Sequence, residues 1–268
     1  MQDKAVYCET YINYASDADR AARQVTIFNG RQTPLSFAEN GFELIEHRSE
    51  VTDWLDPTQQ HKHCAEIASV AKDYADCDWV LFYPALVRSE EQAAVSADYA
   101  PVQIAHSDYT EKYRSMLGDD DHPYRQILAP SMAAADITGQ DIRNAQRLLT
   151  IQFWRSIGDP VCQWPLCFGD CQTFLRDELY AVLVEEYGGE RTEFESLLVL
   201  PGNEKEHQWY TFPNMAAHEV VMFRAYDSDL ATSGGHFWTP HTAFYDPCVP
   251  KEASHRQSIE MRAICGFN

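Results

Sequence analysis

Apolar residues in the first part of the chain recur at two different spacings. Residues 25–28 and 42–45 are short apolar runs between polar turns, and each predicts a β-strand. Between residues 57 and 75 apolar residues recur at helical spacing, and an Asp-Pro-Thr sequence that opens the pattern is typical of a helix start. Residues 78–83 predict a buried strand, and residues 136–149 predict a second amphipathic helix.

The second half of the chain is richer in strand patterns. One helix-like stretch, residues 173–186, lies among them. Closely spaced short strands bounded by Gly, Pro and Asp predict an antiparallel sandwich or barrel, with the helices of the first half packed outside it. No segment has the composition of a linker. We therefore expect one domain over residues 1–268, in which residues 1–77 pack on a barrel formed by about residues 78–268. The predicted strands are residues 151–154, 196–200, 209–212, 220–226, 236–244 and 259–264.

Charged stretches predict the exposed parts of the molecule. Residues 110–121, which end in an acidic run, are expected to form a solvated loop or a lid. Residues 61–63 and 204–207 combine histidines with charged neighbours, and both are expected on exposed faces.

Composition and charge narrow the class of partner. Over its 268 residues the chain has 41 Asp and Glu against 21 Lys and Arg, a net charge of -20, which disfavours nucleic acid and anionic membrane surfaces as partners. The first 14 residues are polar, and the longest apolar run, residues 79–87, is too short to cross a bilayer. We expect a cytoplasmic protein that binds a small molecule. Its eight cysteines lack the spacing of a structural zinc site, so reduced thiols are expected.

A candidate metal site begins where an apolar run ends in His106 and Asp108. Side chains two residues apart on a strand point to the same face, so this imidazole and this carboxylate can reach one metal ion. Of the ten histidines, His106 alone has an acidic residue two positions later. A second histidine would complete the 2-His-1-carboxylate set that binds Fe(II) and leaves positions open for other ligands. His241 is the candidate, with His218 and His236 as alternatives.

A candidate carboxylate clamp follows His241 by fifteen residues. Arg256 and Ser258 form the only R-x-S sequence in the chain, directly before an apolar strand. A guanidinium and a hydroxyl on one strand face can bind the distal carboxylate of a cosubstrate such as 2-oxoglutarate. Arg262 can lie on the same face and is the alternative clamp or a substrate partner.

Two further residues are candidates for cofactor binding, each with a structural alternative. Tyr109 can donate a hydrogen bond to the cosubstrate or can pack in the core. Arg155 can face the pocket or can form a structural ion pair, because a buried arginine needs a partner.

With these motifs the sequence resembles the CmcJ/NvfI-type, gibberellin-desaturase-like family of 2-oxoglutarate-dependent oxygenases of secondary metabolism. The resemblance covers about residues 78–268, and its last two motifs are the most specific. One departure is Ser107, where the family usually has Asn. The matching segments are 106–110 (HSDYT), 153–155 (FWR), 164–166 (WPL), 209–213 (WYTFP), 222–228 (MFRAYDS), 240–244 (PHTAF) and 256–262 (RQSIEMR).

The resemblance implies a double-stranded β-helix, a cupin-like jelly roll, with iron at its open mouth. It implies that His106, Asp108 and His241 hold Fe(II), and that Arg256 and Ser258 hold 2-oxoglutarate. With O₂ as the oxidant, such an enzyme hydroxylates, desaturates or cyclises a small secondary metabolite or a modified amino acid. Two alternatives stay open: a cupin-like binding protein without turnover, and an oxygenase or oxidase that uses the triad without 2-oxoglutarate.

Overall fold

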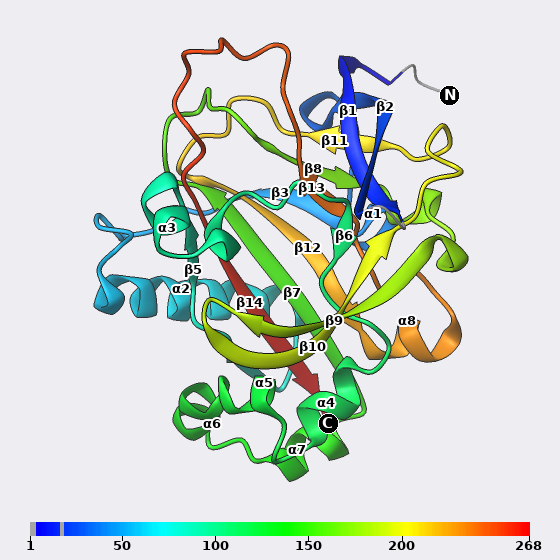
Figure 1. The fold of residues 1–268 in the computed structure, drawn as a ribbon. Coiled ribbons are helices and arrows are strands. Elements are labelled where there is room, and N and C mark those ends of the chain that lie inside the picture. The colour runs from blue at the N-terminus through cyan, green and yellow to red at the C-terminus, as the bar shows by residue number, and fades with distance from the viewer. Residues whose placement is uncertain (1–3, 17–18) are drawn as a thin grey trace.

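Two β-sheets make up most of a computed structural model that describes residues 4–16 and 19–268 (Figure 1). Among the described strands, all neighbouring pairs are antiparallel except β2 with β11. The eight-stranded sheet has the order β1 (Val6–Ser16), β2 (Asp19–Asn29), β11 (Trp209–Thr211), β8 (Leu166–Gly169), β13 (His241–Ala243), β6 (His106–Ser107), β10 (Glu190–Val199) and β9 (Leu179–Tyr187). The six-stranded sheet has the order β3 (Phe42–Glu46), β12 (Glu219–Asp227), β7 (Arg147–Ser156), β14 (Ser258–Phe267) and β4 (Trp79–Phe82), with β5 (Leu86–Arg88) paired to β14.

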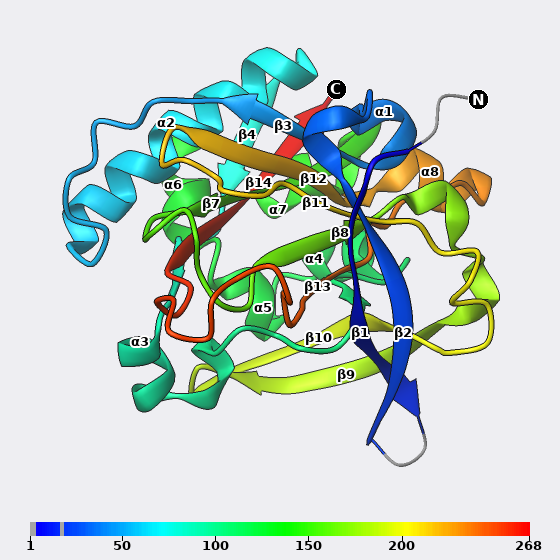
Figure 2. The same cartoon turned by 90° about the horizontal axis from the view of Figure 1, so that it is seen from above.

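The two sheets face each other across an aromatic core. Phe168 of β8 lies 5.2 Å from the ring of Phe223 on β12 and 5.4 Å from that of Phe42 on β3. The eight-stranded sheet curls, so that β9 and β10 pass in front of β7 and β14 (Figures 1 and 2). This mainly β architecture, two facing sheets with flanking helices, confirms the predicted fold class.

Helices flank the sheets and lie mostly in the first half of the chain. Helix α2 begins as predicted, because the Asp56 carboxylate accepts hydrogen bonds from the amides of Thr58 and Gln59 and Pro57 occupies the first turn. Its buried face packs on the outer side of the six-stranded sheet, in a cluster that includes Cys64, Ile67, Ala71, Met261, Ala263 and Cys265. The helices are α1 (Phe37–Asn40), α2 (Pro57–Ala75), α3 (Glu90–Val95), α4 (Tyr113–Gly118), α5 (Pro123–Gln126), α6 (Ala129–Ala135), α7 (Gly139–Asn144) and α8 (Ser228–Ser233).

Strand parity in the six-stranded sheet decides which side chains face inward. On β7, Gln152 and Trp154 line the space between the sheets, whereas Ile151 and Phe153 pack with α2. On β14, Glu260 and Arg262 line the same space. The inner face of this sheet therefore carries polar groups into the interior, which is unusual for a core and indicates a binding site.

Most predicted strands are present, but two predicted helices are wrong. Residues 136–149 form only α7, because Leu148 and Leu149 pair with β14 as part of β7. Residues 173–186 contain one short 3₁₀ turn, Arg176–Glu178, followed by β9, which pairs with β10. Residues 236–244 contain only the short strand β13.

Some residues predicted to be exposed are buried. Within residues 110–121, Tyr113, Met116 and Leu117 of α4 pack in the main core, so this part is not a solvated loop, whereas residues 119–121 of the acidic run are exposed as predicted. His63 and His207 are only 3% and 5% exposed, because each packs against aromatic rings that the sequence pattern did not place nearby.

The buried His63 predicts a pH-dependent stability. Burial, with the nearby Arg155 guanidinium, lowers the pKa of His63 to about 4. Because this is below the value of about 6.5 in the unfolded chain, the unfolded state binds more protons between these values and stability falls as the pH drops through that range. The H63F variant should lose this part of the pH dependence, about 2 kcal/mol between pH 7 and pH 5. Denaturant unfolding at several pH values measures it; the matched variant H61F, at an exposed histidine, should keep the wild-type profile.

Two further expectations can be compared with the described residues. No helix among them is both long and apolar enough to cross a membrane. All eight cysteines are free, and Cys248 alone of them is exposed. This agrees with the expected reduced thiols, and both their redox state and the cytoplasmic location stay predictions.

Candidate active site

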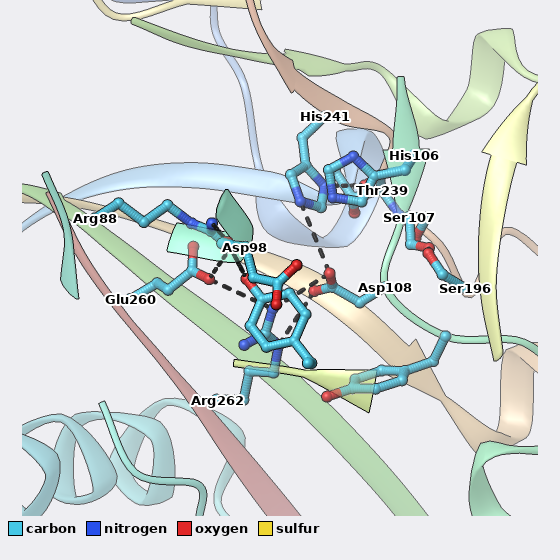
Figure 3. A network of polar contacts seen from close by, with 12 residues as sticks. Arg88, Asp98, His106, Ser107, Asp108, Ser196, Thr239, His241, Glu260 and Arg262 are labelled. Carbon is cyan, nitrogen blue, oxygen red and sulfur yellow. Dashed lines mark hydrogen bonds and ion pairs between the residues drawn. The ribbon is translucent and has the colours of Figure 1, made fainter. Parts of the chain in front are cut away.

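Two adjacent strands bring the predicted metal ligands together. His106 of β6 and His241 of β13 are direct partners across the strand pair, and their ring centroids lie 4.3 Å apart. Asp108 follows β6 on the same side, and its Oδ1 lies 3.9 Å from Nε2 of His241. One potential ligand atom of each residue lies within 4.8 Å of the others (Figure 3). Among the described residues no other group of three His, Cys, Asp or Glu side chains comes this close together.

Backbone carbonyls orient both imidazoles. Nδ1 of His106 lies 2.8 Å from the carbonyl oxygen of Ile104, and Nδ1 of His241 lies 3.0 Å from that of Thr239. A carbonyl oxygen only accepts, so each Nδ1 carries the proton and each Nε2 keeps a free lone pair. This is the arrangement in which metal-binding histidines are usually held. Ser107 points the other way, where its hydroxyl accepts from the amide of Thr239 at 3.3 Å.

The charge states of the three side chains suit a divalent cation. Burial lowers the pKa of His106 to about 4 and also lowers that of His241, so both rings are neutral at neutral pH. Burial alone would raise the pKa of Asp108, but the Arg262 guanidinium and the two imidazoles outweigh it and lower this pKa to about 2. Two neutral imidazoles and one carboxylate form the donor set of a facial triad, so these residues fit Fe(II).

A cavity of about 720 Å³ opens beside the triad. Its apolar wall comes from both sheets and from the segments around β5 and α5. The polar part of its lining contains three arginines and two buried carboxylates besides the histidines. The apolar lining includes Val87, Ile104, Leu166, Val182, Val184, Phe194 and Leu198, and the charged lining includes Arg88, Asp108, Arg256, Glu260 and Arg262.

Arg256 is the one arginine of this cavity that forms no ion pair with a described acidic side chain. It is 3% exposed, donates to the carbonyl oxygen of Trp164 at 3.0 Å, and lies 5.5 Å from the ring centroid of Trp154. Its Nε has no hydrogen-bond partner. Burial lowers the pKa of Arg256 to about 10, yet the group stays charged at neutral pH. A buried cation with a free donor is a ready site for an anion.

The structure brings the other predicted cofactor-binding residues only partly to this cavity. Tyr109 lines it, with its hydroxyl 2.6 Å from that of Tyr124. Ser258 is buried on the same face of β14 as Glu260, but it is not itself among the cavity-lining residues. Arg155 faces the α2 side instead, where it donates to the carbonyl oxygen of His47 at 2.9 Å. It directly follows the inward-facing Trp154 on β7, so strand alternation turns it away from the cavity.

The alternative residues have other environments. Arg262 donates to both oxygens of Asp108 at 3.3 Å, so it is already paired with an acid. His236 and His218 are not among the cavity-lining residues.

Two charged residues of the site were missed in the sequence. Glu260 lies two positions from Ser258 and from Arg262, so strand alternation within the R-x-S-x-E-x-R sequence contains a signal for it. Arg88 on β5 has no such signal. It reaches the site because β5 pairs with β14, and its guanidinium donates to Glu260 at 3.0 Å (Figure 3).

The chain matches a family model and several known proteins in sequence. Residues 3–266 match the family model described as an oxidoreductase/YMDC permease-like domain. The Fe(II)/2-oxoglutarate-dependent dioxygenase nvfI of Aspergillus novofumigatus is 31% identical over 202 residues, which cover 66% of this chain and 69% of that protein. The alpha-ketoglutarate-dependent dioxygenase phiK of a fungal species is 24% identical over 254 residues, which cover 91% of this chain and 84% of the relative.

Solved structures match the fold along the whole chain. A single-residue variant of the iron and alpha-ketoglutarate-dependent endoperoxidase NvfI superposes with a TM-score of 0.77 at 20% identity, covering 100% of this chain and 99% of the other. A further NvfI structure superposes with a TM-score of 0.75 at 19% identity, covering 98% of this chain and 99% of the other. The full-length family match and the sequence identity to nvfI lead to one conclusion: this chain belongs to the NvfI-like family of Fe(II)/2-oxoglutarate-dependent dioxygenases, the oxidoreductase/YMDC permease-like domain family.

Proposed function

We propose that this protein uses Fe(II), 2-oxoglutarate and O₂ to oxidise a small secondary metabolite. The observation that carries the proposal is the convergence of His106, Asp108 and His241, from two distant parts of the chain, beside a cavity. Each histidine presents Nε2 with its Nδ1 already bonded, and the carboxylate is ionised. These are the protonation states that metal coordination requires.

Arg256 is the proposed partner of the distal carboxylate of 2-oxoglutarate, with Ser258 as a second donor. Its uncompensated buried charge and its free Nε support this assignment over Arg262, which is already engaged by Asp108. A carboxylate that binds there replaces water with a charge-assisted hydrogen bond in a buried setting, where such bonds are strong.

The residues of this chain would bind, orient and shield the reactants. Iron with 2-oxoglutarate and O₂ supplies the oxidising power that removes hydrogen from an unactivated C–H bond. The triad would hold the metal. Arg256 would hold the far carboxylate of the cosubstrate and so orient its 2-oxo acid end toward the triad. The apolar wall of the cavity would place the reacting carbon of the substrate and exclude water.

The cavity favours a compact and largely apolar substrate. Its wall of Val, Leu, Ile and Phe side chains offers burial rather than charge, and about 720 Å³ is a volume that a small metabolite can fill. Oε1 of the buried Gln152 has no partner and can accept a hydrogen bond from a substrate hydroxyl or amine. The name of one relative, the hydroxylase/desaturase efuI of Hormonema carpetanum, is in keeping with hydroxylation or desaturation as the reaction.

Spectroscopy and O₂ consumption test the proposed function. Anaerobic protein with Fe(II) should develop a visible charge-transfer band when 2-oxoglutarate is added. Without a substrate, slow O₂ consumption should require both additions and should yield succinate. O₂ consumption that is independent of 2-oxoglutarate would favour a triad oxidase, and no spectral change with no consumption would favour a binding protein.

A further inference from the structure

The carboxylate of Asp108 is the last member of a chain of charged side chains that alternate in sign. Metal binding by Asp108 does not by itself require the other members. Arg88 donates to Glu260 at 3.0 Å, and Nη2 of Arg262 lies 3.7 Å from Oε1 of the same glutamate. Arg262 in turn donates to Asp108 (Figure 3). Two positive and two negative groups cancel, so the charge of a bound metal remains available to an anionic cosubstrate.

The two oxygens of Asp108 differ in their surroundings. Oδ1 faces the metal site, 3.9 Å from Nε2 of His241, and it also accepts from Nη2 of Arg262 at 3.3 Å. Oδ2 accepts from Nε of Arg262 at 3.3 Å. A metal ion and Nη2 therefore compete for Oδ1, whereas Oδ2 is held by the Nε donor of the arginine.

Resting on the proposed function, we propose that Arg262 and Glu260 make Asp108 bind the metal through Oδ1 only. Nε of Arg262 retains Oδ2, and Glu260 draws Nη2 away from Oδ1 when the metal arrives. A carboxylate that used both oxygens would occupy an additional position on the metal. One-oxygen binding would leave that position for the cosubstrate or O₂. Arg262 and Glu260 are positioning residues, which act through Asp108.

The two residues should have opposite effects on metal affinity. In R262M the competing cation is gone and both oxygens of Asp108 are free, so Co(II) should bind at least as tightly as in the wild type. The affinity of the metal-loaded protein for 2-oxoglutarate should fall about 10-fold, because an open position is lost. In E260Q, Arg262 has no second anion and pairs fully with Asp108, so Co(II) binding should weaken by about 10- to 100-fold. Arg88 stays anchored in E260Q by two backbone carbonyls and the hydroxyl of Tyr187.

Anaerobic titration with Co(II) alone measures metal affinity without turnover, and its visible spectrum reports the coordination number. The matched control is R224K, at a buried arginine of the same sheet that donates to backbone carbonyls and does not line the cavity. R224K should leave both affinities unchanged. If R262M does not fold, R262K keeps the cation without the planar donor pair and should show the same loss of 2-oxoglutarate affinity in smaller degree.

The outcomes separate this inference from the proposed function. Weaker Co(II) binding in both R262M and E260Q would assign the pair a merely structural role and overturn the inference, as would unchanged 2-oxoglutarate affinity in R262M. A wild-type protein that binds neither Co(II) nor Fe(II) would overturn the proposed function itself.

Discussion

Replacing any one of His106, Asp108 and His241 by alanine should abolish the retention of Fe(II) and lower turnover by about three orders of magnitude or more, equivalent to ~4 kcal/mol of transition-state stabilisation. Each residue contributes one of the three mutually close ligand atoms. A site with two protein ligands loses both affinity and the fixed geometry of the open positions. Metal analysis after desalting measures retention, and O₂ consumption with 2-oxoglutarate measures turnover.

Folding controls decide how that result is interpreted. The melting temperature of the two histidine variants should stay near that of the metal-free wild type, because alanine removes a desolvated polar group and leaves the strand pairing of β6 and β13 in place. D108A should melt at a lower temperature, because it removes a partner of the largely buried Arg262. H218A, at a histidine outside the cavity, should retain metal and activity. A triad variant that keeps full metal content would remove that residue from the proposed ligand set.

The R256M variant should weaken 2-oxoglutarate binding by roughly 100-fold, the effect of removing one member of a buried charge pair. The loss should depend on the distal carboxylate. Wild-type protein should strongly prefer 2-oxoglutarate over 2-oxopentanoate, which has the same 2-oxo acid end and a methyl group at the other. R256M should bind the two acids almost equally. Anaerobic titration of the Fe(II)-loaded protein, followed by the visible band, gives both affinities.

The same pair of acids distinguishes Arg256 from its competitor. R262M should weaken both acids by a similar factor, because its effect is at the metal and not at the distal carboxylate. S258A should reduce the preference for 2-oxoglutarate only several-fold, the effect of one neutral hydrogen bond. If R262M instead abolishes the preference while R256M retains it, Arg262 is the clamp.

Spacing along strands was the most reliable information in the sequence. The two-residue interval between His106 and Asp108 placed both on one face, and the structure has them there, with Ser107 turned to the other side. The same rule applied to β7 would have turned Arg155 away from the cavity, since Gln152 faces inward. Once a strand is recognised, the alternation of its side chains thus predicts which of its residues face the site.

The parts of the fold and of the site that the sequence did not predict depend on contacts between segments far apart in the chain. Residues 173–186 have a helix-like pattern, yet most of them form β9, because pairing with β10 decides the conformation. The apolar Leu183 is exposed on this strand. Arg88 joins Glu260 across the pairing of β5 with β14, which no local pattern predicts. Burial of His63 depends in the same way on Trp54, whose ring centroid lies 5.1 Å from that of the histidine.

The position of β9 at the edge of its sheet affects how easily the cavity of this protein can change its substrate range. Strands β6 and β13, which carry the two histidines, are hydrogen-bonded on both sides, whereas β9 is an edge strand bonded only to β10. Val182 and Val184 of this edge strand form part of the cavity wall. Edge strands separate locally at lower free energy than central ones. Mutations in β9 can therefore reshape the pocket, or let it open for a bulkier substrate, while the strands that carry the proposed metal ligands stay paired on both sides. New substrates then become accessible without changes to the proposed metal centre.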